Sequence, residues 1–169
     1  CRHQSNWQIA KMKSNQIFSD ALVVFPPKIN LEILFSIIQS QTHEIWARRY
    51  GSSIGDGLRY TPTDCYETFP FPRTIYDHLN HKETEIGLSL RKIQTLGQTY
   101  IDFRSELMIN NNEGLTSTYN RFNSPKENSE NIYKLRELHN NLDRELLNLY
   151  GWSDISLKCG FVPDYLEID

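Results

Sequence analysis

The strongest constraint on the fold is a stripe of leucines near the end of the chain, spaced three or four residues apart. Its members are Leu135, Leu138, Leu142, Leu146 and Leu149. This spacing places the leucines on one face of a helix, and that face must be buried against another part of the protein. Ser124-Pro125-Lys126-Glu127 has the form of a capping box and predicts that the helix begins there, while Gly151 predicts its end.

A second stripe of the same spacing predicts another long helix over about 83–108. It consists of Ile86, Leu90, Ile93, Tyr100 and Leu107. Gly87 and Gly97 lie within this segment, and each disfavours a helix by about 1 kcal/mol relative to alanine. A short helix is expected over 115–122, between the two long ones. The two apolar stripes are therefore expected to bury each other in a C-terminal helical bundle.

The first part of the chain has a different pattern. Residues 6–13 and 16–25 are rich in β-branched and aromatic side chains, which predicts two strands. Asn30 is expected to cap one long helix over about 31–50, which Gly51 would end. The predicted fold class is therefore α+β and mostly helical: a short β-strand segment with one long helix, followed by the C-terminal helical bundle.

The charge of the chain also changes along its length. Up to residue 73 it carries eight Lys and Arg against six Asp and Glu, and beyond that residue ten against fifteen. The net charge of −3 argues against a free-standing nucleic-acid binder. Since both charge and predicted structure change at the same place, we predict two domains, residues 1–72 and 73–169.

A stretch rich in rings and prolines, "RYTPTDCYETFPFP" at 59–72, lies at this boundary. Its Thr61-Pro62-Thr63-Asp64 segment predicts one tight turn of helix. Two interpretations of the stretch remain open. Either Cys65, Tyr66, Phe69 and Phe71 pack between the two halves, or the stretch forms a surface that binds another molecule.

The three cysteines, Cys1, Cys65 and Cys159, are widely spaced and odd in number. They predict reduced thiols in a cytoplasmic protein, with Cys65 as a small buried side chain. No Cys-x-x-Cys or His-x-x-x-His pair is present, so a zinc site is not expected. No apolar run approaches the length of about 20 residues that spans a bilayer, and no membrane partner is expected.

Patterns typical of catalysis are lacking. The "GSSIGDG" segment at 51–57 has the glycines of a nucleotide-binding loop but follows a predicted helix, so we interpret it as a polar loop. His139 and Asp143, four residues apart, could pair or hold a metal, but a solvated helix face is the expectation. Asp102 and Glu106 have the same spacing and the same interpretation. No nucleophile–base set is recognisable, so this chain itself is expected to be non-catalytic.

A basic and hydroxyl-rich group of residues is the best candidate binding surface. Arginines, hydroxyls and loop amides are the groups that hold phosphates and contact base edges. The candidate DNA-binding residues are Arg48, Arg49, Ser52, Ser53, Arg59, Tyr60 and Thr61, with Lys11 and Lys13 from the N-terminal segment. Arg48 and Arg49 also have a plain structural explanation, because cations at a helix C-terminus contribute about 0.3–1 kcal/mol.

Three segments carry a resemblance to a known family: "HEIWARRYGSSIGDGLRYTPTDCYETFPFP" (43–72), "GLTSTYNRFNSP" (114–125) and "LRELHNNLDRELLNLYGW" (135–152). They resemble the C-terminal part of large bacterial DNA methyltransferases and fused restriction–modification enzymes of type IIG and related types. The resemblance covers roughly residues 17–169. The chain begins at Cys1 without a methionine, and we expect it to be a piece of such a longer protein.

The resemblance implies that residues 1–72 are the end of a target-recognition domain and that 73–169 are a helical tail. The implied partners are double-stranded DNA and the methyltransferase domain of the parent enzyme. S-adenosylmethionine is the implied cofactor of that parent, and no cofactor is expected in this chain. Neither an Asn-Pro-Pro-Tyr loop nor an acid-x-Lys nuclease set occurs in the sequence. The alternative is a protein–protein module whose acidic helical half mediates subunit or domain assembly.

Overall fold

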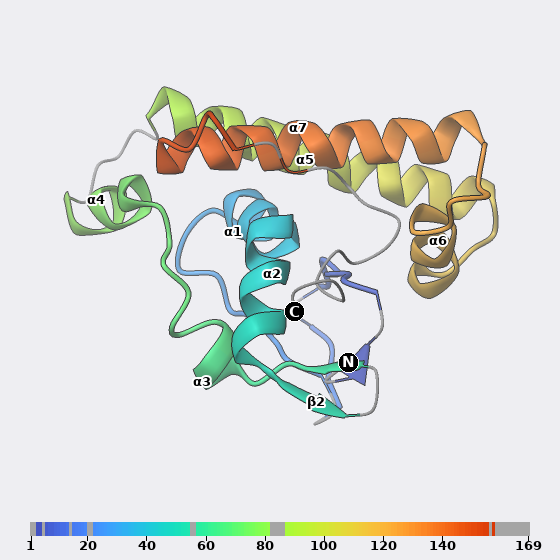
Figure 1. Cartoon of the computed structure of the whole chain (residues 1–169), viewed down its shortest axis with the longest axis horizontal. Helices are drawn as coiled ribbons and strands as arrows, with labels where there is room; N and C mark the ends of the chain where they lie inside the picture. Colours follow the sequence, from blue (N-terminus) through green and yellow to red (C-terminus); the bar gives the residue numbers. More distant parts are fainter. Residues whose placement is uncertain are drawn as a thin grey trace.

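The computed structural model describes residues 3–4, 6–13, 15–19, 22–54, 57–81, 87–155 and 157. Within these residues the chain is mostly helical with a small sheet, as the predicted α+β class requires (Figure 1). The helices are α1 (Leu31–Gln39), α2 (Gln41–Tyr50), α3 (Pro62–Cys65), α4 (Arg73–His81), α5 (Leu88–Asn110), α6 (Leu115–Phe122) and α7 (Glu130–Tyr150). The strands are β1 (His3–Gln4), β2 (Ser52–Ile54) and β3 (Gly57–Arg59), which pair antiparallel in the order β1-β3-β2.

The two long helices α5 and α7 lie side by side, as the apolar stripes predict (Figure 1). Stripe residues of both helices are buried in shared clusters, Leu90 and Ile93 with Leu146, and Tyr100 with Leu135. Gly151 ends α7 in the left-handed conformation at φ 74°, which confirms the predicted stop.

The predicted start of α7 is wrong. The helix begins at Glu130 with Ser129 as its N-cap, so Ser124-Pro125-Lys126-Glu127 lies outside it. Glu127 accepts a 2.7 Å hydrogen bond from Arg121 Nε instead of serving a capping box. Ser124 accepts from the amide of Lys126, which closes a local turn. These side chains therefore organise the α6–α7 connection rather than the first turn of α7.

The two predicted N-terminal strands are also wrong. Residues 6–13, and the described residues between 15 and 25, form no strand. Trp7 is buried and donates from Nε1 to the carbonyl of Ile38 at 2.8 Å, while the amide of Ile9 donates to Gln39 Oε1. Apolar side chains of this segment pack against α1, and the amide of Ile9 bonds to a side chain of α1 rather than to another strand.

The single helix predicted over 31–50 is two helices that meet at Ser40. Asn30 caps α1 as expected and accepts from the amides of Glu32 and Ile33. Ser40 is extended (φ −65°, ψ 155°) and caps α2 by accepting from the amide of His43. The same hydroxyl donates to the carbonyl of Ile37 at 2.7 Å. Ser40 therefore ends one helix and begins the next.

Helix α1 packs against α5 at a very close crossing. A Cβ added to Gly97 would lie 2.5 Å from the carbonyl oxygen of Glu32 and closer still to the hydroxyl of Ser36. Glycine is thus required here by the approach of α1, although its effect on helix propensity is unfavourable. Phe35 and Ile33 of α1 share clusters with Tyr100 and Ile93 of α5. Residues on either side of the predicted boundary therefore share a core, and the division at residue 72 stays a prediction.

The proline-rich stretch at 59–72 is chiefly a packing segment. Cys65 and Phe69 are buried in two different clusters, and Tyr66 and Phe71 are packed against them. Phe69 shares its cluster with Leu146 of α7, so the expected packing between the two halves is observed. The predicted turn at residues 61–64 is α3, and Pro62 occupies its first position. Helix α4, which follows, is an element that no sequence pattern above predicts.

Candidate nucleic-acid interface

The end of α2 leads directly into the β2–β3 hairpin and places basic side chains beside it. Gly51 ends α2, and a Cβ at this position would lie 2.5 Å from the carbonyl oxygen of Ala47. Strand β2 pairs with β3 so that Ser52 lies opposite Arg59 and Ser53 opposite Leu58. Directly opposed residues of an antiparallel pair share one face. Ser52 and Arg59 therefore share the exposed face, and Leu58 is buried on the other.

The charges on this face differ in how they are compensated. Arg48 is half-buried and pairs with Glu44, with Nη2 at 2.7 Å from the carboxylate. Arg49 and Arg59 are exposed, and within the described part of the chain neither belongs to an ion pair. Exposed guanidinium groups next to a hydroxyl can contact phosphate oxygens without first breaking an internal pair. We call Arg49, Ser52 and Arg59 the arginine face.

Other predicted site residues lie elsewhere or have another role. Lys11 pairs with Glu32 at 2.8 Å, in the first turn of α1, and Lys13 is exposed in the same N-terminal segment. Thr61 is half-buried at the start of α3. The side chain of Ser53 lies outside the described set, although its backbone is part of β2.

Tyr60 is a core residue, which corrects the prediction that it faces DNA. It is 5% exposed, and its hydroxyl lies 2.9 Å from Nε2 of His43. Burial lowers the pKa of His43 to about 3, so the ring is neutral. Burial also raises the pKa of Tyr60, with smaller contributions from Cys65 and Tyr66. The neutral His43–Tyr60 pair joins α2 to the residue that directly follows strand β3.

His139 and Asp143 do not lie on a solvated helix face, which corrects a second prediction. They are 4% and 2% exposed, and Nδ1 of His139 lies 3.2 Å from Oδ2 of Asp143. The sequence signal was available, because positions 139 and 143 flank Leu142 on the face that Leu135 and Leu146 define. Polar residues inside an apolar stripe indicate a buried polar contact. No group of three or more metal-ligating side chains occurs among the described residues.

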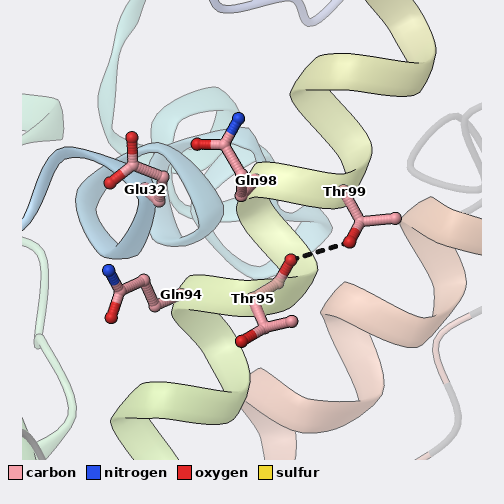
Figure 2. Close-up of a pocket in the computed structure, with 5 residues that line it drawn as sticks. All are labelled: Glu32, Gln94, Thr95, Gln98 and Thr99. Carbon is pink, nitrogen blue, oxygen red and sulfur yellow. Dashed lines mark hydrogen bonds between the residues drawn. The ribbon is translucent and has the colours of Figure 1, made fainter.

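A shallow polar hollow of about 430 Å³ lies between the start of α1 and the middle of α5 (Figure 2). It is lined by Glu32, Gln94, Thr95, Gln98 and Thr99. Thr99 donates to the carbonyl of Thr95, and the hydrogen bond from Lys11 is the main cause of the lowered pKa of Glu32. The hydroxyls of Thr95 and Thr99 both donate to backbone carbonyls of their own helix.

Comparison with known proteins identifies one part of the chain. Residues 6–73 match the family model described as MmeI, target recognition domain. The resemblance to the target-recognition part of a restriction–modification enzyme is thereby confirmed for this segment, which contains the whole arginine face. No curated protein and no solved structure matches the chain. Among the described helices, none is both long and apolar enough to cross a membrane.

Proposed function

We propose that the chain recognises double-stranded DNA as the non-catalytic specificity part of a bacterial restriction–modification enzyme, with 73–169 as its helical tail. The observation that carries this proposal is the coincidence of two facts. The segment similar to a target-recognition domain also carries two exposed arginines, Arg49 and Arg59, that form no ion pair with another described residue, and Arg59 lies opposite Ser52 in the β2–β3 pair.

The chemistry of methylation belongs, in this proposal, to the parent enzyme. Its methyltransferase domain would bind S-adenosylmethionine and modify adenine, and the present chain would dock to that domain and to DNA. The chain supplies positive charge and hydrogen-bond donors for phosphate oxygens and base edges. Enzymes that modify a base take it out of the duplex, and a recognition domain holds the duplex in register while this happens.

The test is DNA binding by the full chain, measured by fluorescence anisotropy on labelled duplexes over a series of salt concentrations. Replacement of Arg49 and Arg59 together by alanine should weaken binding while the melting temperature stays unchanged. If both arginines touch phosphate, binding falls about equally for all duplexes, and the salt slope drops by about 0.9 per contact. If Arg59 contacts a guanine edge, only cognate binding falls, by about 1–3 kcal/mol.

Arg91→Ala is the matched control, because Arg91 is an exposed arginine of α5 outside the arginine face. It removes one positive charge, as each single replacement of Arg49 or Arg59 by alanine does, and we expect DNA affinity within about twofold of wild type. Equal weakening by Arg91→Ala and by the single Arg49 and Arg59 replacements would show that net charge alone matters. Unchanged affinity and salt slope in the Arg49 and Arg59 double variant would refute the proposal.

The alternative of a protein–protein module is favoured by the acidic surplus of residues 74–169, ten Lys and Arg against fifteen Asp and Glu. Anionic surfaces repel DNA and suit a basic protein partner. A chain that fails to bind duplex DNA at low salt, but forms a salt-sensitive complex with a purified methyltransferase domain, would establish this alternative.

A further inference from the structure

The junction between α1 and α2 is held from the far end of the sequence. Nε2 of His139 lies 3.1 Å from the carbonyl oxygen of Gln39, the last residue of α1. The amide of Gln41, the first residue of α2, donates to Oδ1 of Asp143 at 2.9 Å. Helix α7 thus bonds to the backbone on both sides of Ser40, across about 100 residues of sequence.

The chemistry of these contacts makes them directional. A carbonyl oxygen only accepts, so Nε2 of His139 carries the proton. The amide of Gln41 is one of the first amides of a helix, which have no partner within the helix, and Asp143 accepts from it. The carboxylate also lies at the positive end of the α2 dipole. Since His139 and Asp143 are buried, no water can readily replace either contact when it breaks.

The junction is one of the contacts that set the direction of α2, together with the His43–Tyr60 hydrogen bond and the contact of Cys65 with the carbonyl of Ala47. It buries two of its ten side chains, His43 and Ala47. Arg49 lies eight residues beyond Gln41, a rise of about 12 Å. A rotation of roughly 10° at the junction would move Arg49 by about 2 Å, by the same helix geometry. Such a shift exceeds the range of about 0.5 Å over which a hydrogen-bond length varies.

We propose that His139 and Asp143 are positioning residues for DNA recognition. They fix the angle between α1 and α2, and through α2 they fix where Arg49 and the β2–β3 hairpin are presented. The helical tail is in this view part of the recognition apparatus and not only a scaffold. This inference rests on the proposed function, because it assigns a role toward the DNA that the arginine face would contact.

The test compares variants in the full chain. Asp143→Leu removes the acceptor for the Gln41 amide, whereas Asp143→Asn keeps an oxygen of the same shape. His139→Phe keeps a ring of similar size but leaves the Gln39 carbonyl without its donor. Leu135→Ala is the control, because Leu135 is a buried α7 residue in the cluster with Tyr119 and Phe122 of α6. It should lower the melting temperature without removing either hydrogen bond of the junction.

Two quantities are measured at a temperature where each variant is folded by circular dichroism. One is the affinity for a labelled 30-base-pair random duplex, and the other is the sequence motif enriched from a pool of randomised duplexes. Asp143→Leu and His139→Phe should bind DNA at least tenfold more weakly. The motif that they enrich should show a weaker base preference at each position than the wild-type motif. Asp143→Asn should stay within about threefold of wild type, and Leu135→Ala within about twofold.

Two results would overturn the inference. One is wild-type affinity and motif in folded Asp143→Leu or folded His139→Phe. The other is an equal loss in Leu135→Ala, which would mean that general destabilisation explains the effect. If Asp143→Leu does not fold, the comparison of His139→Phe with Leu135→Ala decides. Unchanged binding in the Arg49 and Arg59 double variant would instead refute the proposed function, so the two failures are distinguishable.

Discussion

Replacement of Gly97 by alanine tests the packing on which the whole arrangement depends. The added methyl group would lie 2.5 Å from the carbonyl oxygen of Glu32 and 3.3 Å from its carbonyl carbon, atoms that cannot rotate away. Alanine would gain about 1 kcal/mol in helix propensity. Overpacking costs about 1–3 kcal/mol, and the upper part of this range, about 2–3 kcal/mol, applies here because the contact is with rigid backbone and requires α1 and α5 to separate. We therefore expect a net loss of about 1–2 kcal/mol in the free energy of unfolding.

The assay is thermal and urea unfolding of the full chain by circular dichroism. A loss of this size lowers the melting temperature by about 2–8 °C in a protein of this length. Thr99→Ala, on an exposed position of the same helix, is the control and should change stability by no more than about 0.5 kcal/mol. Adding Ser36→Ala should not restore stability, because the Glu32 carbonyl remains in place. A melting temperature equal to or above wild type would refute the close crossing of α1 and α5.

Three further predictions concern the core. The folded-state pKa of His43 is about 3, below its unfolded value of 6.5, so the unfolded state alone takes up a proton on acidification. Stability should therefore fall by about 2 kcal/mol between pH 7 and pH 5, and His43→Gln should remove that loss; identical pH profiles in urea titrations would contradict this. Residues 73–169 expressed alone should be helical but melt below the full chain, because α5 loses Phe35 of α1; a disordered spectrum would contradict the two-domain division. Arg104 is 4% exposed, and Tyr119 is its hydrogen-bond partner. Arg104→Met should lower stability by about 2 kcal/mol, because it removes the hydrogen bond to Tyr119 and the contact of the guanidinium with the rings of Phe35 and Tyr100; an unchanged calorimetric stability would contradict this.

Features set by local periodicity were predictable from the sequence. The stripes of α5 and α7, the cap at Asn30 and the stop at Gly151 each depend on residues a few positions apart. From local propensity, Gly97 predicts only a weaker helix. The reason that glycine is needed there is the close approach of Glu32, 65 positions earlier in the chain. Its role could not be inferred from local propensity.

The errors share a physical cause, which is that the deciding partner lies far away in sequence. Residues 6–13 have strand composition, but Trp7 finds its hydrogen-bond partner at Ile38 and not on a neighbouring strand. The break at Ser40 is supported by Asp143 of α7, which no pattern within 31–50 reveals. Tyr60 follows exposed Arg59 in the sequence, and this position alone predicts that it is exposed too. The partner of its hydroxyl, His43, lies on α2 and holds it in the core.

The candidate site was predictable in part. The basic residues at the end of α2 and in the following loop are recognisable from residue type, and Arg49, Ser52 and Arg59 are all exposed. The pairing of Arg48 with Glu44 and of Lys11 with Glu32 was not foreseen. The second pair joins residues 21 positions apart, on segments whose contact depends on how the N-terminal residues cover α1.

The most direct test of the central claim is hydrogen–deuterium exchange of the full chain with and without a 30-base-pair duplex at low salt. The account predicts slower exchange on DNA binding in peptides that cover the end of α2 and strands β2 and β3. Peptides that cover α5 and α7 should exchange as they do in the free protein. Protection confined to α5 and α7, or no protection at saturating duplex, would show that DNA does not contact the arginine face.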